Sequence, residues 1–322
     1  MANALKAVVL AAGKSTRMNS RTTKVLHRIL GKEIINYLLD SLAACAIADP
    51  DIVVVAGDNH AEIAAAVKRK VVYALQREQL GTAHALLAAG EQLAGFDGDV
   101  LVLVGDNPYI TSEALQKLIA AHRRRRAHCT FISAVFPGPP PPYGRVLRDA
   151  RGGIRGVVEE KDATPGQRRI REVNAAIYLF DNRVVFPLLA RIDNRNAKQE
   201  YYLTDIIAIL RRDKRTVQAV QADDCAIAIG INDRQDLQAA HDKFNRQIQQ
   251  RLMAECGVTI LQPGTVTVEH DVEIGRDTVL FPCTYLAAGT RIGRNCTIGP
   301  FSYLRNVRIG DGETVSDEKR ED

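Results

Sequence analysis

The sequence lacks the paired cysteines and histidines that zinc sites and disulfide frameworks require. Its six cysteines lie far apart without a C-x-x-C pair, and its seven histidines show neither H-x-H nor H-E-x-x-H spacing. This pattern predicts reduced, mostly buried thiols in a cytoplasmic protein without a zinc site.

Long hydrophobic runs and strong charge are also missing. No apolar stretch reaches the roughly 18 residues that a membrane helix needs, and the first residues lead into a strand without a charged and apolar leader. The net charge of +5 is modest for 322 residues. The basic run 123–126 follows the end of a predicted helix, where cations complement the helix dipole. We therefore expect neither secretion, nor a membrane, nor a nucleic-acid partner.

Two common phosphate-binding motifs are absent around Gly13. A Walker A loop needs a glycine five residues earlier, where the chain has Val8, and the dinucleotide motif G-x-G-x-x-G fails at Ser15. The stretch nevertheless has the character of an oxyanion site, because an apolar strand runs into Gly13 and cations follow at Arg17 and Lys24. A glycine-led loop after a strand exposes successive N–H groups that bind phosphate. An ordinary turn with solvated cations is the alternative.

The first part of the chain alternates apolar strands with amphipathic helices. We expect strands at 6–11, 51–56, 71–75 and 99–104, and helices at 33–45, 60–68 and 82–93. Such alternation predicts an α/β domain with a mostly parallel sheet covered on both faces, whose ligands bind at the carboxyl ends of the strands. Gly13, Gln76 and Asp106 each follow a predicted strand, so one crevice can hold all three.

From about residue 128 the pattern changes towards antiparallel strands. We expect strands at 129–136, 144–148, 154–159 and 173–180, and helices at 201–210 and 233–256. The proline run 137–142 cannot donate ladder hydrogen bonds and is expected to form a stiff loop; a polyproline docking segment is the alternative.

A repeat of six residues follows Gly257. Apolar residues recur at this spacing from Val268 to Leu304, and a slip of one residue then gives Ile309 and Val315. Hexapeptide spacing predicts a parallel β-helix, here with fewer than three coils of about 18 residues. The expected domains are an α/β domain at 1–232, a linker helix at 233–256, a short β-helix at 257–316 and a disordered charged tail at 317–322.

The signature 10–18, followed by 24–27, resembles that of sugar-1-phosphate nucleotidylyltransferases, and most closely bacterial N-acetylglucosamine-1-phosphate uridylyltransferase. The family generally has glycine where this chain has Ser15 and commonly proline where it has Thr23. Further motifs of the family are matched at 76–82, 143–145, 158–163 and 200–205. The resemblance implies a Rossmann-like sheet domain followed by a short left-handed parallel β-helix.

The resemblance also assigns roles to residues. Arg17 and Lys24 would be catalytic, and a Mg²⁺ cofactor would be held by Asp106 and by Asn232 of the segment Gly230-Ile231-Asn232. The expected nucleotide-binding residues are Leu10, Ala12, Gly13, Lys24, Gln76, Gly81 and Thr82. The expected sugar-binding residues are Gly144, Glu159, Asn174 and Thr204.

Residue chemistry agrees with these roles and leaves alternatives. A carboxylate at a strand end is a hard ligand that suits Mg²⁺, although Asp106 alone also fits a turn or helix cap. The side-chain amide of Gln76 suits the imide edge of uracil, although a surface turn is the plain alternative. We expect His84 to be structural. Ala175-Ala176 stands where the family usually has Thr-Gly, and we expect these two methyl-bearing residues to narrow the sugar pocket.

The expected function is attack of N-acetylglucosamine 1-phosphate on the α-phosphate of UTP, giving UDP-N-acetylglucosamine and pyrophosphate. One alternative is another sugar 1-phosphate or nucleotide, such as glucose 1-phosphate or dTTP, and another is a non-catalytic sensor or scaffold. Bifunctional members of the family carry further coils with an acetyltransferase site. Since His270 is the only histidine in the repeat, we expect no acetyl transfer. A homo-oligomer, with a trimer as the family pattern, stays open.

Overall fold

The computed structural model describes residues 4–13 and 15–321, so Lys14 of the signature loop and the ends of the chain lie outside it. The chain divides into two compact units. The first unit comprises residues up to Leu26 and Ile34–Ile231, and the second comprises His27–Glu33 and the chain from Asn232 onward. The contribution of residues 27–33 to the second unit was not foreseen from the sequence.

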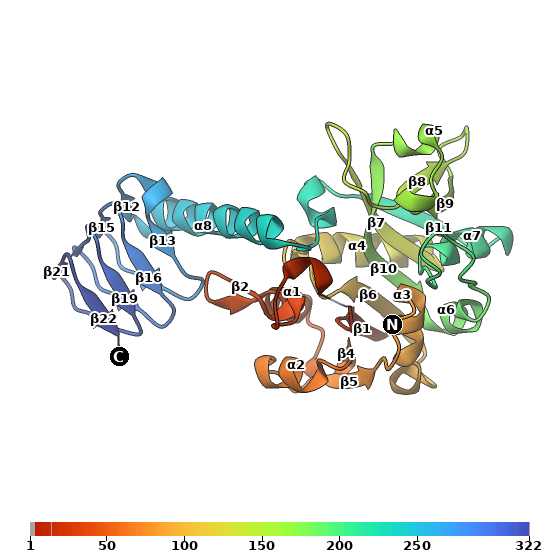
Figure 1. Ribbon diagram of the computed structural model, residues 1–322, viewed down its shortest axis with the longest axis horizontal. Helices are drawn as coiled ribbons and strands as arrows, with labels where there is room; N and C mark the ends of the chain where they lie inside the picture. Colours follow the sequence, from red (N-terminus) through yellow and green to blue (C-terminus); the bar gives the residue numbers. More distant parts are fainter. Residues whose placement is uncertain (1–3, 14, 322) are drawn as a thin grey trace. The chain divides into compact units, whose positions relative to one another are not determined.

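Within the described residues, the first unit is built on a nine-stranded sheet (Figure 1). Its main path runs β11-β7-β10-β6-β1-β4-β5, with β8 and β9 attached beside β10. The strands are β1 (Ala4–Leu10), β4 (Ile52–Ala56), β5 (Val72–Leu75), β6 (Gly98–Val104), β7 (Cys129–Val135), β8 (Arg145–Arg148), β9 (Ile154–Val158), β10 (Glu172–Asp181) and β11 (Val217–Gln221).

The central strands are parallel, as the sequence predicts. β1 pairs in parallel with β4 and β6, and β4 pairs in parallel with β5. β10 runs antiparallel to β6 and β7, whereas β11, which was not predicted, pairs in parallel with β7. The carboxyl ends of β1, β5 and β6 therefore meet at one edge of the sheet.

Both faces of the sheet are covered because consecutive side chains of its strands enter different cores. Val8 packs into one apolar cluster, and its neighbours Ala7 and Val9 pack into the other. The cluster that contains Val9 is completed by α1 (Ile34–Ala44), α2 (His60–Ala66) and α4 (Ser112–Arg125). The cluster that contains Val8 is completed by α3 (Thr82–Ala88), α6 (Asn182–Leu189) and α7 (Asp205–Arg212).

Short helical turns lie at the ends of several elements. They are α5 (Pro165–Arg168), η1 (Thr16–Met18), η2 (Lys24–Leu26), η3 (Asp49–Asp51), η4 (Glu91–Leu93), η5 (Glu160–Asp162), η6 (Cys225–Ala228) and, in the second unit, η7 (Pro263–Thr265).

Two predicted helices differ from the observed ones. The helix expected at 82–93 ends at Ala88, because a glycine at position 90 interrupts it and the chain continues as η4. The helix expected at 201–210 begins only at Asp205. Residues 201–204 lie outside the helix, and the backbone of Tyr201 is instead bonded to another segment: Tyr201 N donates to Leu80 O at 2.7 Å and Tyr201 O accepts from Ala83 N at 2.9 Å. The proline run 137–142 is a loop between β7 and β8, as predicted.

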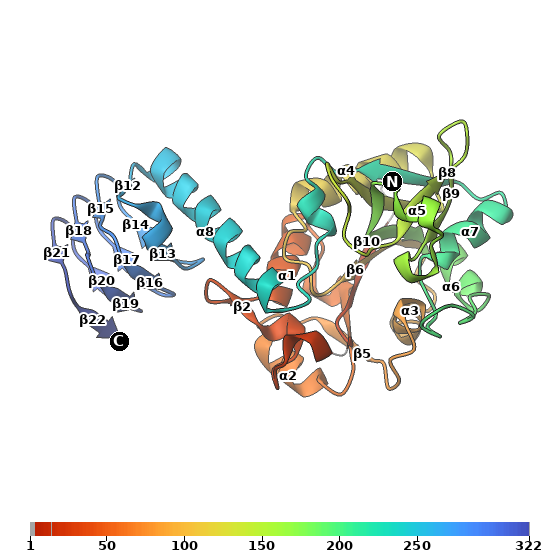
Figure 2. The same cartoon turned by 45° about the horizontal axis from the view of Figure 1, so that its top comes forward.

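The second unit contains a parallel β-helix in which short strands stack in three sheets (Figure 2). Inward side chains repeat every 18 residues, so that Val268 lies beside Leu286 and Leu286 beside Leu304. The sheets are β12 (Thr259–Ile260), β15 (Val279–Leu280), β18 (Thr297–Ile298) and β21 (Thr314–Val315); β13 (Thr267–Val268), β16 (Tyr285–Ala287), β19 (Tyr303–Arg305) and β22 (Lys319–Glu321); and β14 (Glu273–Ile274), β17 (Arg291–Ile292) and β20 (Arg308–Ile309).

The β-helix is longer than predicted, because two of its sheets hold four strands each. The expectation of a disordered tail at 317–322 is wrong for Lys319–Glu321, which pair with β19 as β22. The open edge of β19 explains the pairing, since Tyr303 N donates to Glu318 O at 2.9 Å. The Lys319 ammonium also lies 5.9 Å from the centre of the Tyr303 ring. Asp322 lies outside the described residues.

A long helix, α8 (Arg234–Cys256), covers the first coil of this β-helix. Gln249 Nε2 donates to Val266 O at 2.7 Å, and Leu252 packs into the apolar cluster of the coils. The hairpin of β2 (Arg28–Ile29) and β3 (Lys32–Glu33) contacts the same coil, because Leu30 O accepts from His270 N at 3.1 Å. His270 therefore has a packing contact within this unit.

Two further expectations can be compared with the structure. Among the described residues, no helix has the length and apolar character needed to span a bilayer. All six cysteines are free, as predicted, but they are not mostly buried. Only Cys129 and Cys296 are buried, and Cys283 is exposed on the β-helix.

Candidate active site

The residues predicted to bind a nucleotide line one cavity of about 460 Å³ in the first unit. It lies where β1, β5 and β6 end, which is the edge that a parallel sheet offers to ligands. Its walls include every predicted nucleotide-binding residue and the predicted metal ligand: Leu10, Ala12, Gly13, Lys24, Gln76, Gly81, Thr82 and Asp106.

Gly13 forms an open part of the cavity wall. It is exposed, and a methyl group added at its α-carbon would meet no other atom within 4 Å. The loop is anchored just before this point, because Ala11 N donates to Val55 O at 2.8 Å. The backbone at Gly13 is therefore accessible to a ligand while the strand that leads into it is held by the sheet.

Lys24 and Asp106 form an ion pair at the edge of the cavity. Their side chains are 16% and 21% exposed, so the pair is accessible but partly shielded from water. One cavity therefore contains an ammonium group, which can bind phosphate, and a carboxylate, which can bind a divalent metal ion.

The Asp106 loop is fixed by contacts to the segment that leads to Asn232. Asp106 O accepts from Ile231 N at 2.9 Å, and the buried Asn107 donates to Ile227 O at 2.6 Å. Gly230 approaches so closely that an added β-carbon would lie 3.0 Å from an Asp106 carboxylate oxygen. Asn232 directly follows Ile231 and belongs to the second unit.

Gln76 is buried in the cavity wall with its amide held in one orientation. Its Nε2 lies 3.3 Å from Gly81 O and 3.0 Å from Nδ1 of His84. A carbonyl oxygen can only accept, so the Gly81 contact identifies the nitrogen of the amide and leaves His84 Nδ1 as an acceptor. The Gln76 oxygen is then the group that can accept a hydrogen bond from a base. His84 thus contacts a predicted nucleotide-binding residue through its ring nitrogen.

A smaller cavity of about 70 Å³ contains the predicted sugar-binding side chains Glu159, Asn174 and Thr204. Leu10, Thr82 and Val104 line both cavities, so the two are adjacent. Gly144 does not line it but supports it. Gly144 O accepts from Asn174 N at 2.9 Å, and a β-carbon there would lie 3.2 Å from Glu159.

The small cavity has one acidic lining residue, Glu159, and a second acid, Asp205, directly follows its lining residue Thr204. Glu159 accepts a hydrogen bond of 3.0 Å from the Thr204 hydroxyl, and burial raises the pKa of its carboxyl group. Burial, together with the neighbouring Glu159 charge, raises the pKa of Asp205 to about 6. The Glu159 carboxyl group can accept hydrogen bonds from sugar hydroxyls, but holding Glu159 and Asp205 charged at the same time is unfavourable.

The two alanines that depart from the family pattern have different positions. Ala176 lines the small cavity and adopts a left-handed backbone with φ of 56°. Ala175 is buried in the apolar cluster on the opposite face of the sheet. Only the methyl group of Ala176 therefore narrows the sugar cavity.

Some predicted residues are not brought together, and some lining residues were missed. Arg17 is exposed on η1 and lines neither cavity. Gln79 and Glu200 line the nucleotide cavity, and Tyr178 lines the sugar cavity, where Asn174 Nδ2 lies 2.6 Å from its hydroxyl. Gln79 and Glu200 lie inside the matched motifs 76–82 and 200–205, so the sequence could have indicated both. Tyr178 lies outside every matched motif.

The fold and the paired cavities define a class, the nucleotidyltransferases. Residues 7–193 match the model of the MobA-like NTP transferase domain, and residues 271–306 match the bacterial transferase hexapeptide of six repeats. The first match covers more than half of the chain and contains both the signature loop and Asp106. The second lies within the coils and confirms the predicted left-handed β-helix.

Similar proteins identify the family. The chain is 45% identical to the bifunctional protein GlmU of Pelotomaculum thermopropionicum, over 97% of this chain and 67% of that protein. It is 40% identical to GlmU of a Geobacillus species over 96% of this chain and 66% of that protein, and 41% identical to GlmU of Mycobacterium bovis over 96% and 63%. The chain belongs to the GlmU family, and it spans about two thirds of the length of these curated relatives.

This result confirms the predicted family and the predicted class of enzyme. It also favours the expected uridylyl transfer, which forms UDP-N-acetylglucosamine, over the alternatives. A nucleotidyltransferase of this family implies a divalent metal ion. Among the described residues, no group of three or more His, Cys, Asp and Glu side chains lies close enough together to hold a metal ion.

Proposed function

We propose that this chain joins UTP and N-acetylglucosamine 1-phosphate in the first unit. A phosphate oxygen of the sugar phosphate attacks the α-phosphorus of UTP, and the bond to the β-phosphate oxygen breaks as pyrophosphate leaves. Such a transfer requires alignment of the reactants and stabilisation of charge rather than covalent help from the protein.

The binding roles follow from the chemistry of each wall. The Gln76 oxygen accepts from the imide N–H of uracil, and Gly81 and Thr82 form the wall beside it. The Gly13 backbone and Lys24 bind the triphosphate, and Arg17 adds positive charge from the signature loop. Glu159, Asn174 and Thr204 bind the sugar, with Gly144 supporting the first two.

We assign the metal to Mg²⁺ and its protein ligands to Asp106 and Asn232. The donor set consists of a carboxylate and an amide oxygen, which are hard ligands that suit this ion, and phosphate and water complete its coordination. When bound, Mg²⁺ supplies charge neutralisation to the triphosphate. Asp106 fits the role because it is partly exposed in the same cavity as Gly13 and Lys24.

One observation carries the proposal: the nucleotide cavity and the sugar cavity are adjacent, because the same residues, Leu10, Thr82 and Val104, line both. A nucleotide bound against Gln76 and Gly13 would therefore lie beside a sugar bound against Glu159 and Asn174. Direct transfer of the uridylyl group from one substrate to the other requires the two substrates to be bound side by side in this way.

The test is pyrophosphate release with Mg²⁺ across a panel of nucleotides and sugar phosphates. The proposal expects the highest kcat/KM for UTP with N-acetylglucosamine 1-phosphate, at least about tenfold above glucose 1-phosphate or dTTP. A higher value for another pair would support the alternative substrate, which the methyl group of Ala176 in the sugar cavity makes worth testing. Tight binding of a UDP-sugar without any turnover would support the non-catalytic sensor instead.

We also propose that the protein works in the cytoplasm as a homo-oligomer, without a nucleic-acid partner. Six free cysteines support a reducing compartment, and the stacked coils offer a surface for association. Light scattering of the purified chain tests the assembly, and a monomer at micromolar concentration would contradict it.

A further inference from the structure

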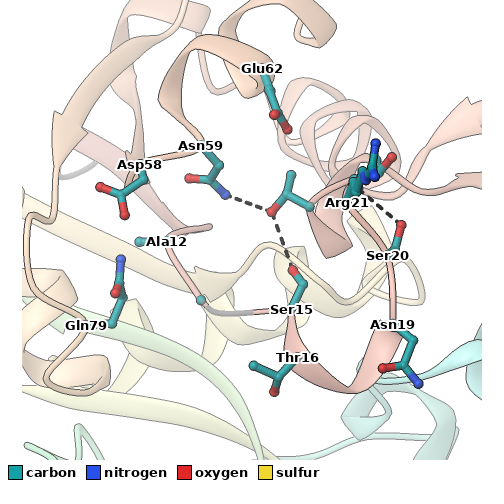
Figure 3. A pocket seen from close by; sticks show the side chains of 13 residues that line it. Ala12, Ser15, Thr16, Asn19, Ser20, Arg21, Asp58, Asn59, Glu62 and Gln79 are labelled. Atoms are coloured by element: carbon teal, nitrogen blue, oxygen red, sulfur yellow. Dashed lines mark hydrogen bonds between the residues drawn. The ribbon is translucent and has the colours of Figure 1, made fainter.

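A second polar cavity of about 500 Å³ adjoins the signature loop in the first unit (Figure 3). Its walls include Ser15, Asn59 and Gln79, and it shares Ala12 and Gly13 with the nucleotide cavity. The signature loop therefore lies between the two cavities. Side chains that line the second cavity can determine the position of this loop.

Asn59 is the fixed end of a hydrogen-bond chain that runs behind the loop. Its oxygen accepts from Gly57 N at 2.9 Å, and its Nδ2 donates to Ala11 O at 3.3 Å. A backbone N–H can only donate and a carbonyl can only accept, so both contacts specify the same orientation of the amide. Asn59 thus ties the end of β4 to the end of β1.

The chain continues from Asn59 to the signature loop. Asn59 Nδ2 also donates to Thr23 Oγ1 at 2.8 Å, and Thr23 Oγ1 lies 3.5 Å from Ser15 Oγ. Figure 3 shows the two dashed contacts, from Asn59 and from Ser15, meeting at one hydroxyl group. The second contact is long, so Ser15 depends on it less than on its next partner.

That next partner is the backbone of the catalytic lysine. Lys24 N donates to Ser15 Oγ at 2.7 Å, which is a short and well-formed bond. Ser15 and Lys24 are nine residues apart, and this bond closes the loop between them. The position of the Lys24 backbone is therefore coupled to Ser15, and through Thr23 and Asn59 to the sheet.

We propose that Ser15, Thr23 and Asn59 are positioning residues, which hold the Lys24 backbone so that its ammonium group reaches the triphosphate. Ser15 supplies the direct bond, while Thr23 and Asn59 orient the serine hydroxyl and connect it to β1 and β4. The inference rests on the proposed role of Lys24, and it goes beyond that role by assigning these three side chains to its alignment.

The proposal predicts an effect that requires Lys24. Replacing Ser15 with alanine removes one hydrogen bond from a partly buried backbone N–H, which corresponds to a fall in kcat of about fivefold to tenfold. If Ser15 acts through Lys24, replacing Ser15 in a Lys24→Ala protein should not change kcat further, because the ammonium group that Ser15 positions is already absent. A serine that only stabilised the fold would lower activity by the same factor in both backgrounds.

The experiment is a double-mutant cycle on uridylyl transfer with Ser15→Ala, Lys24→Ala and the double variant. Ser20→Ala is the matched control, because Ser20 lines the same cavity but its hydroxyl accepts only from Thr22 N in the described contacts, at 3.1 Å. Thr23→Val and Thr23→Ser extend the test, since valine removes the hydroxyl and serine restores it. Thermal unfolding of each variant monitors folding.

We expect Ser15→Ala to lower kcat with little change in the melting temperature, and to have no further effect once Lys24 is alanine. Thr23→Ser should recover most of the activity that Thr23→Val loses, and Ser20→Ala should match the wild type. Equal losses from Ser15→Ala in both backgrounds, or wild-type kcat in Ser15→Ala, would overturn the inference. Wild-type kcat in Lys24→Ala would instead contradict the proposed function, so the two failures are distinguishable.

Discussion

The ammonium group of Lys24 is ion-paired with the carboxylate of Asp106, and both side chains line the nucleotide cavity. This pairing joins the signature loop after β1 to the loop after β6, two segments that are 82 residues apart in sequence. It holds the groups proposed to bind phosphate and metal beside each other within one cavity.

The first prediction concerns this pair. Lys24→Ala and Asp106→Ala should each lower kcat about a hundredfold or more, because the first removes a positive charge that stabilises the triphosphate in the transition state and the second removes a proposed ligand of the metal ion. Pyrophosphate release under saturating substrate measures the effect. Lys117→Ala is the matched control, since Lys117 forms an ion pair with the exposed Asp223 away from the cavities and should retain wild-type activity. Activity near that of the wild type in either cavity variant would count against the assignment.

Gly81 provides a prediction about the base-binding end. Its φ is +119°, and an added β-carbon would lie 2.5 Å from Tyr201 O, so Gly81→Ala combines backbone strain with a clash. We expect a rise of at least about tenfold in KM for UTP and a loss of about 1–2 kcal/mol or more in the free energy of unfolding.

Gly152→Ala separates the strain from the clash. Gly152 also has a positive φ, +80°, but nothing lies within 4 Å of the added carbon. This variant should show the loss of stability due to strain while leaving the KM for UTP unchanged. Equal KM values for Gly81→Ala and the wild type would show that the wall formed by Gly81 does not contact the nucleotide.

Ala176 provides a prediction about the sugar. Its left-handed φ of 56° is unfavourable for a residue with a β-carbon, so Ala176→Gly should stabilise the fold by about 1 kcal/mol. The same change removes a methyl group from the wall of the sugar cavity and should widen the range of sugar phosphates accepted. Urea unfolding and competition between sugar phosphates measure the two effects.

Ala175→Gly is the control for this substitution. Ala175 is buried in the opposite cluster, so removing its methyl group should destabilise the protein without changing the choice of sugar. An altered sugar preference in Ala175→Gly, or none in Ala176→Gly, would contradict the assignment.

Asp205 provides a prediction about pH. Its pKa in the folded protein is raised to about 6 by burial and by the Glu159 charge, so the folded state binds a proton more tightly than the unfolded chain does. The wild type therefore loses stability from this group as pH rises from about 4 to about 6. Asp205→Asn lacks the carboxyl group, so its stability relative to the wild type should increase over that range and then stay constant.

Denaturant unfolding of both proteins at pH 4.5 and 7.5 would measure this difference. Asp213→Asn should show the opposite sign, because a hydrogen bond from Arg191 lowers the pKa of Asp213. Its stability relative to the wild type should fall as pH rises towards about 4, the ordinary pKa of an aspartate, and should stay constant between pH 4.5 and 7.5. A pH-independent difference for Asp205→Asn would show that burial does not perturb this carboxyl group.

Much of the site could be predicted from the sequence because its residues follow strands. Gly13, Gln76 and Asp106 each come after an apolar run, and a parallel sheet brings the carboxyl ends of its strands to one edge. The nucleotide wall was therefore predictable without a structure. The roles of its residues remain proposals.

What escaped prediction depends on tertiary contacts rather than on local pattern. Tyr178 and Asn59 lie in segments without a recognisable motif, and their importance follows only from the partners that the fold brings to them. Ser15 and Thr23 were noticed as departures from the family pattern, but nothing in the sequence indicated that they contact each other. The strand at 319–321 was missed because its charged composition is typical of a free tail, whereas an open strand edge supplied its partner.

The most direct test of the central claim is to measure metal binding together with nucleotide binding. Mn²⁺, used as a spectroscopic substitute for Mg²⁺, should bind the wild type in the presence of UDP-N-acetylglucosamine with a stoichiometry of about one ion per chain. Asp106→Ala and Asn232→Ala should each weaken that same ion at least about tenfold, while Lys117→Ala leaves it unchanged. Mn²⁺ affinity that both cavity variants retain in full would contradict the account, because the nucleotide and the ion would then not meet at Asp106 and Asn232.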